Sequence, residues 1–226
     1  MSARQGSARK RPRIPRKRPG PAGGVRDINR RDNLRRLCDA GLALFLARGT
    51  ADVTIEEIVG RARMAKGSFY RYVADKTELV ASIMAPVEAE VTQALDRCEH
   101  ALHEARQDQL AVIYMQLASE LSAVVGRHAP RVLLYLQEAR APRGGARAAI
   151  HAFAELLTAR AVSLTEVASD HALIRGVDPR TTALAVTGAI EALLFSYLRG
   201  TVTLAATDIP TVTGELVAII LRGVRV

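Results

Sequence analysis

Tryptophan is absent from this chain of 226 residues, and aromatic side chains make up only 4% of it. Since hydrophobic residues still amount to 49%, the core must consist of Leu, Val, Ile and Ala, which suit closely packed helices. The length is enough for one large domain or two small ones. The two cysteines, Cys38 and Cys98, exclude a disulfide scaffold. We expect buried free thiols, with a single disulfide as the alternative.

Acidic residues are missing from the first 26 positions, which contain nine Lys or Arg residues. The net charge of the whole chain is +9, so the remainder is neutral. Repeated Pro and Gly within residues 1–24 predict a disordered basic arm. A polyanion such as a nucleic acid is its expected partner, and a solvated tail without a partner is the alternative.

A secretory signal is not predicted, because Pro and Gly rather than an apolar stretch follow the basic start. The longest apolar runs, such as 183–195, contain Glu191 and are shorter than a membrane span. The sequence also lacks a Gly-rich phosphate loop and a nucleophile elbow, so we expect neither an enzyme nor a bound cofactor. We therefore expect a soluble cytoplasmic protein without a membrane partner.

Helical spacing of apolar residues runs from about 26 to 48 and ends at Gly49, which suits the left-handed position after a helix. Thr54 and Glu57 have the spacing of a capping box, which predicts that a second, short helix starts there. Residues 65–73, AKGSFYRYV, predict a third helix. Such a set of short helices, with a tight turn between the second and third, is typical of a helix-turn-helix.

In a helix-turn-helix, the third helix presents its N-terminal end to the major groove of DNA. Lys66 is placed to reach a phosphate or a guanine edge, and Gly67 lets the backbone approach the DNA. Arg71 suits guanine, the Tyr70 hydroxyl suits a phosphate, and Lys76 suits the flanking DNA backbone. The residues expected to bind DNA are Thr54, Lys66, Gly67, Ser68, Tyr70, Arg71, Tyr72 and Lys76.

Residues 54–80, TIEEIVGRARMAKGSFYRYVADKTELV, closely resemble the DNA-binding signature of TetR-family regulators. The resemblance implies a homodimer of all-helical subunits, with a variable domain whose ligand lowers DNA affinity. It also implies phosphate contacts at Lys66 and Tyr70 and base contacts at Ser68 and Arg71. Two positions depart from the family pattern: Arg63 stands where Gly is common in the turn, and Val73 where Phe is common.

The predicted fold class is all-α, with an N-terminal three-helix helix-turn-helix domain and an all-helical domain for ligand binding and dimerisation. We expect the basic arm at 1–24, the DNA-binding domain at 25–77 and the ligand-sensing and dimerisation domain at 78–226. Breaks at Gly and Pro divide the last part into candidate helices at 78–105, 108–125, 130–140, 146–170, 179–199 and 211–223. Pro86 predicts a kink in the first of these.

The last two candidate helices are apolar on most sides, which predicts burial on most sides. Small residues such as Gly188 and Ala192 allow close helix approach. Two such helices from each subunit would form a four-helix bundle, as the resemblance also implies. An ordinary core within one chain is the alternative.

A ligand cavity is expected between the middle helices, with a mostly aliphatic lining that suits a lipophilic ligand. Its candidate lining residues are Tyr114, Met115, Tyr135, Gln137, His151 and Phe153. A metal site is not expected, because the two-residue spacing of Cys98 and His100 places them on different faces of a helix.

The predicted function is a DNA-binding transcriptional regulator, a repressor released from a near-palindromic operator by a small-molecule effector. One alternative is a non-specific nucleoid-type or RNA-binding protein that uses the arm as its main site. The other is an enzyme on a helical bundle, which requires clustered acids or histidines facing one cavity.

Overall fold

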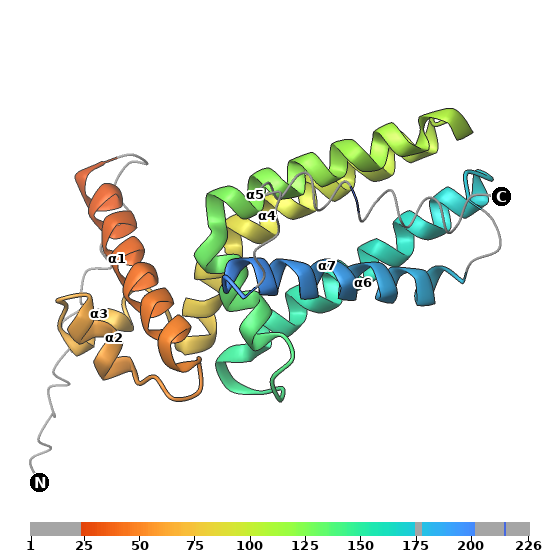
Figure 1. The fold of residues 1–226 in the computed structure, drawn as a ribbon. Coiled ribbons are helices and arrows are strands. Elements are labelled where there is room, and N and C mark those ends of the chain that lie inside the picture. The colour runs from red at the N-terminus through yellow and green to blue at the C-terminus, as the bar shows by residue number, and fades with distance from the viewer. Residues whose placement is uncertain (1–23, 175–177, 202–214, 216–226) are drawn as a thin grey trace, which may run out of the picture.

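The computed structural model describes residues 24–174, 178–201 and 215, and these residues form helices and turns with no strand among them (Figure 1). The all-α prediction is confirmed. The helices are α1 (Val25–Arg48), α2 (Ile55–Arg61), α3 (Lys66–Phe69), α4 (Lys76–His103), α5 (Leu110–Glu138), α6 (Ala148–Asp170) and α7 (Pro179–Leu198), with short 3-10 turns η1 (Gln107–Gln109) and η2 (Gly145–Arg147).

The ends of the first helices follow their local sequence. The C-cap of α1 is Gly49 with φ +82°, and its N–H donates to Phe45 O at 2.7 Å. At the start of α2, the Thr54 hydroxyl accepts from the Glu57 N–H at 3.3 Å, while Glu57 Oε2 accepts from the Thr54 N–H at 2.8 Å. This is the predicted capping box. Asp75 caps α4 in a similar way by accepting from the Glu78 N–H at 2.9 Å.

The third helix is shorter than predicted. Only Lys66–Phe69 is α-helical, and the chain continues through hydrogen-bonded turns as far as Val73. The turn before it contains Arg63 at φ +52°, the left-handed conformation that glycine adopts most easily. Arg36 of α1 supports that turn by donating to Ala62 O at 2.6 Å.

A kink in α5 replaces the break predicted between 108–125 and 130–140. The structure continues the helix through this region, with non-helical φ and ψ at His128, two residues before Pro130. Pro130 has no N–H for the helical ladder, which accounts for a local distortion there. Pro86 lies within the continuous helix α4.

Helix α4 is the centre of the fold, because α1, α5 and α6 all pack against it. Helices α1–α3 cluster at one end of the molecule, and α4–α7 extend away from them (Figure 1). One buried cluster joins α1–α4 to the near parts of α5 and α6, and a second lies at the far end around Leu102 and Leu164. Cys38 and Cys98 are buried free thiols, as expected, and burial raises their pKa values to about 11 and about 12.

Two helical segments, Gln107–Glu138 and Pro179–Leu198, are long and apolar enough to cross a membrane by length and composition alone. The run 183–195 is short by itself, but it belongs to a helix of 20 residues, so its exclusion by length was wrong. Core helices of soluble proteins pass the same test. The predicted helix at 211–223, except residue 215, and the predicted arm, except residue 24, lie outside the described residues.

Candidate functional site

An exposed polar surface surrounds the short helix α3, and it consists of Lys66, Gly67, Tyr70 and Arg71. We call these four residues the α3 surface. The ring of Tyr70 is 56% exposed, which is unusual for a large aromatic side chain. It packs edge-to-face on the fully buried ring of Phe69, with centroids 5.4 Å apart. The buried neighbour therefore fixes the start of a side chain whose hydroxyl end is open to solvent.

Lys66 is paired with Glu56 of α2 across the turn. Hydrogen bonding and charge from Glu56 raise the pKa of Lys66, and the same contact lowers the pKa of Glu56. Both side chains are more than half exposed, 61% and 57%. A pair that exposed contributes little to stability, so Lys66 can exchange Glu56 for another anion at small cost.

The other predicted DNA-binding residues are less available. Thr54 is exposed, but its hydroxyl belongs to the capping box. Ser68 and Tyr72 are half-buried, and the Tyr72 hydroxyl accepts from Asn33 Nδ2 at 3.0 Å.

The role expected for Lys76, contact with the flanking DNA backbone, needs a correction. Its ammonium donates to the carbonyls of Thr50 at 2.8 Å, Val53 at 2.7 Å and Ala51 at 3.3 Å. All three N–H donors of the Lys76 ammonium are thus bound to the connection between α1 and α2. The ammonium has no further N–H for a DNA phosphate.

A buried ionic link joins the end of α1 to α5 and η2. Glu138, the last residue of α5, has a side chain that is only 5% exposed. Its carboxylate accepts from the Thr50 N–H at 3.0 Å, the Thr50 hydroxyl at 2.9 Å and Arg147 Nε at 2.5 Å. We call Thr50, Glu138 and Arg147 the Glu138 link.

The surroundings of the Glu138 link favour its charged form. Burial raises the pKa of Glu138, but the Arg147 guanidinium and the two Thr50 donors outweigh that effect, so the pKa lies below its usual value. A Cβ atom on Gly49 would lie 3.0 Å from Glu138 Oε1. Glycine at this position therefore serves both the turn and the close approach of the carboxylate.

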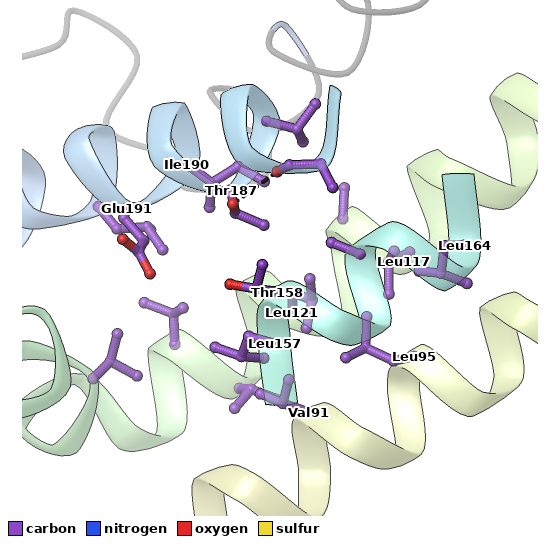
Figure 2. Close-up of a pocket in the computed structure, with 18 of the residues that line it drawn as sticks. Val91, Leu95, Leu117, Leu121, Leu157, Thr158, Leu164, Thr187, Ile190 and Glu191 are labelled. Carbon is purple, nitrogen blue, oxygen red and sulfur yellow. Dashed lines mark hydrogen bonds between the residues drawn. The ribbon is translucent and has the colours of Figure 1, made fainter. Parts of the chain in front are cut away.

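A cavity of about 270 Å³ lies between α4, α5, α6 and α7 (Figure 2). Its walls are almost entirely aliphatic and aromatic, as expected from the composition. The polar exceptions are a few hydroxyls and the carboxylate of Glu191. This volume is close to the lower end of the range of about 300–1,000 Å³ for small-molecule sites.

Of the residues expected to line the cavity, Tyr114, Tyr135 and Phe153 do so. The assignment was wrong for three others, because the lining does not include Met115, Gln137 or His151.

Helix geometry accounts for the three errors. Met115 follows a lining residue by one position, which turns it about 100° around the helix, and it is 46% exposed. Gln137 follows the lining residue Leu136 by one position, and His151 precedes the lining residue Phe153 by two, so each lies on a different face. Sequence reasoning missed Glu191 as a site residue, although it is the lone acid in an apolar run.

Tyr135 and Glu191 form the main polar contact at the cavity. The Tyr135 hydroxyl donates to Glu191 Oε1 at 2.5 Å. Burial and this contact raise the pKa of Tyr135, so the phenol stays protonated at neutral pH. Arg140 approaches Glu191 Oε2 from the outside at 3.6 Å, with a side chain that is 67% exposed.

The histidines do not assemble a metal site within the described part of the chain, where no group of three or more His, Cys, Asp and Glu side chains is placed to hold an ion. His103 and His171 face each other with Nδ1 and Nε2 3.4 Å apart. His100 lies on the exposed side of α4.

Comparison with known families gives a match over residues 37–83 to the family described as bacterial regulatory proteins, tetR family. The match covers the second half of α1, all of α2 and α3, and the start of α4. It therefore includes the α3 surface. No curated protein sequence matches the chain at a significant level.

Solved structures of similar fold include FadR from Bacillus subtilis in complex with stearoyl-CoA, with a TM-score of 0.62 and 15% identity, covering 84% of this chain and 99% of that one. SmeT, the repressor of the Stenotrophomonas maltophilia multidrug efflux pump SmeDEF, has a TM-score of 0.61 and 21% identity, covering 84% and 89%. PfmR from Thermus thermophilus has a TM-score of 0.63 and 14% identity, covering 84% and 100%.

These similarities agree with the geometry at the N-terminal end. After a tight turn, the chain places the exposed Lys66 on a short helix and the exposed Tyr70 and Arg71 directly after it, within the segment that matches the family. The described residues as a whole have the all-helical fold of these solved structures. The chain therefore carries a segment at residues 37–83 that matches the tetR family of bacterial regulatory proteins, within an all-helical fold that solved TetR-family regulators share.

Proposed function

We propose that this protein is a repressor that binds a near-palindromic operator as a homodimer and leaves it when a small molecule fills the cavity. DNA binding is assigned to residues 25–77, and ligand sensing and dimerisation to residues 78–226. The basic arm would add affinity through phosphates. As a regulator of operator DNA, the protein would act in the cytoplasm.

The observation that carries the DNA-binding part is the α3 surface. Lys66 on the short helix α3, and Tyr70 and Arg71 in the turn that follows it, are exposed together around the buried Phe69. Arg suits the acceptor edge of guanine, while Lys and the Tyr hydroxyl suit phosphates. Two copies of this surface, one from each subunit, would occupy successive major grooves about 34–36 Å apart.

The proposal that a ligand releases the protein from DNA is supported by helix α5, which extends from the cavity to the Glu138 link. Tyr135 lines the cavity, and Glu138 holds Thr50 beside the DNA-binding helices. The two residues are three positions apart, which is about 4.5 Å along one helix. A ligand that displaces Tyr135 would therefore shift the carboxylate that fixes the end of α1.

The homodimer is supported by the apolar surface of α7. One face of this helix packs on α6, yet Leu184 remains 52% exposed. A second copy of the chain would cover this face with its own α7. Sedimentation of the protein at micromolar concentration is expected to give a dimer, and a monomer would contradict this part of the proposal.

Two of the solved relatives illustrate the proposed behaviour in other proteins. FadR from Bacillus subtilis was solved with stearoyl-CoA, and SmeT is a repressor of an efflux pump. We transfer to this chain only the general behaviour, a repressor that binds a small molecule in its helical part.

The test is a gel shift with the DNA immediately upstream of the protein's own gene, in the presence of scrambled competitor. The double variant Tyr70→Phe, Arg71→Ala is expected to lose the shift, because it removes a phosphate donor and a base contact. Arg143→Ala is the matched control, since Arg143 is exposed and paired with Glu155 of α6.

Equal binding of the wild type to scrambled DNA, unaffected by the double variant, would contradict a sequence-specific regulator. Loss of that non-specific binding on deletion of residues 1–23 would favour the arm as a general polyanion-binding segment.

A further inference from the structure

The cavity contains one charged side chain and no positive one among the described residues that line it. That charge is the carboxylate of Glu191, which points from α7 toward the open space between the helices (Figure 2). The Glu191 side chain is 26% exposed, so its carboxylate is only partly removed from water, and polar partners among the surrounding aliphatic side chains offset the lost hydration. Tyr135 supplies one hydrogen bond from within the protein.

Four of the six hydroxyls that line the cavity have used their protons, and those of Tyr114 and Thr182 have no hydrogen-bond acceptor among the described residues. Thr158, Thr165 and Thr187 donate to backbone carbonyls of their own helices at 3.0, 2.8 and 2.7 Å. Tyr135 donates to Glu191. A hydroxyl that has donated its proton still has lone pairs, so these four groups leave the cavity with acceptors to offer. With the Glu191 carboxylate these acceptors outnumber the two remaining hydroxyl donors, so an occupant that supplies N–H donors fits the lining better than one that supplies only acceptors.

The existing ion pair of Glu191 is weak enough to be replaced. Arg140 lies 3.6 Å from Glu191 Oε2 and has a largely exposed side chain, so water screens the contact. A positive group inside the cavity would face the same carboxylate with water excluded, where charge-assisted hydrogen bonds are stronger. An anionic head group would instead meet a like charge.

We propose that the cavity binds a lipophilic amine in its ammonium form, with the N–H donors directed at Glu191 and the neighbouring Thr187 hydroxyl. The apolar part of the ligand would pack against the side chains of α4 and α5, such as Leu95 and Leu121. This inference rests on the proposed function only in treating the cavity as the effector site. Binding of an amine can be measured without DNA.

The first experiment uses three probes that share one alkyl chain: decylamine, decanol and decanoic acid, each far below its micelle concentration. Isothermal titration calorimetry with the wild-type protein is expected to rank decylamine first, at least about tenfold tighter than decanol, with decanoate the weakest. Decanoate that binds as tightly as decylamine would overturn the proposal.

The second experiment repeats the titrations with Glu191→Gln. Decylamine is expected to lose about tenfold to a hundredfold in affinity, the usual effect of removing a charged hydrogen-bond partner, while decanol keeps its affinity and so shows that the cavity is intact. Glu155→Gln, on the outer side of α6, is the matched control and should bind decylamine as the wild type does.

Unchanged decylamine affinity in Glu191→Gln, or no binding of any probe to the wild type, would overturn the assignment of the ligand class. The gel shift without ligand distinguishes this failure from a failure of the proposed function. A specific shift with no amine binding overturns only the ligand class, whereas amine binding with no specific shift supports the ligand class and contradicts the operator.

Discussion

The two ends of the molecule carry their candidate sites in opposite ways. At the α1–α3 end the interior is filled, with Leu37, Phe45, Ile58 and Phe69 fully buried, and the functional groups stand outside. At the α4–α7 end the candidate site is the interior itself, a cavity that the chain leaves unfilled. The DNA binding proposed for the first end needs rigid positioning of surface groups, whereas the ligand sensing proposed for the second needs space whose occupation changes the packing around it.

The largest expected effect compares one substitution at the two ends. Leu37→Ala removes a fully buried side chain from the filled end and is expected to lower the free energy of unfolding by about 4 kcal/mol. Leu121→Ala removes a side chain that already borders the cavity and is expected to cost about 1 kcal/mol. Urea unfolding of both variants measures the two values, and equal costs would contradict the contrast in packing.

The connection between the two ends should depend on the Glu138 link. Glu138→Ala leaves Arg147 without its buried partner and Thr50 without an acceptor, so we expect a loss of about 3 kcal/mol. The exposed pair of Glu155 with Arg143 serves as the control, and Glu155→Ala should cost less than about 1 kcal/mol. A loss in Glu138→Ala no greater than in the control would show that the link contributes no more than a surface ion pair.

A stabilising change is expected in the turn before α3. Arg63→Gly places the preferred residue at φ +52° and should raise stability by about 1 kcal/mol, the usual cost of a left-handed non-glycine residue. Arg61→Gly is the matched control, because Arg61 is helical and glycine there should cost about 1 kcal/mol. Thermal unfolding of both variants should show shifts of opposite sign, and a lower melting temperature for Arg63→Gly would refute this explanation.

The smallest expected effect is the pH dependence of the capping box. The Thr54 N–H and Arg48 lower the pKa of Glu57 from 4.5 to about 2. Because the folded pKa is lowered, the stabilisation is complete above pH 4.5 and is lost as the pH falls toward 2. The stability difference between the wild type and Glu57→Gln should therefore shrink across this window. A difference that stays constant with pH would indicate that the charge of Glu57 contributes nothing.

Local sequence rules predicted the N-terminal end well. The capping box of Thr54 and Glu57 and the C-cap at Gly49 each depend on residues within a few positions of one another. The strained turn at Arg63 was also visible as a departure from the family pattern.

The features that the sequence did not predict depend on contacts between residues far apart in the chain. The bonds that occupy Lys76 reach back more than twenty positions to carbonyls of another connection, and the Glu138 link joins residues 88 positions apart. The faces of α5 and α6 that border the cavity depend on the rotation of each helix against its neighbours. The sequence does not define that rotation. Tyr114 and Tyr135 were therefore assigned correctly to the lining, but their neighbour in sequence, Met115, was assigned to it wrongly.

The most direct test of the whole account measures the coupling between the two ends. The operator affinity of the wild-type protein is measured by fluorescence anisotropy at rising decylamine concentrations, and decylamine affinity is measured with and without saturating operator. We expect the amine to weaken operator binding by about 100-fold and operator to weaken amine binding by the same factor, since coupling is reciprocal. Operator affinity that stays constant while the amine saturates the cavity would contradict the central claim.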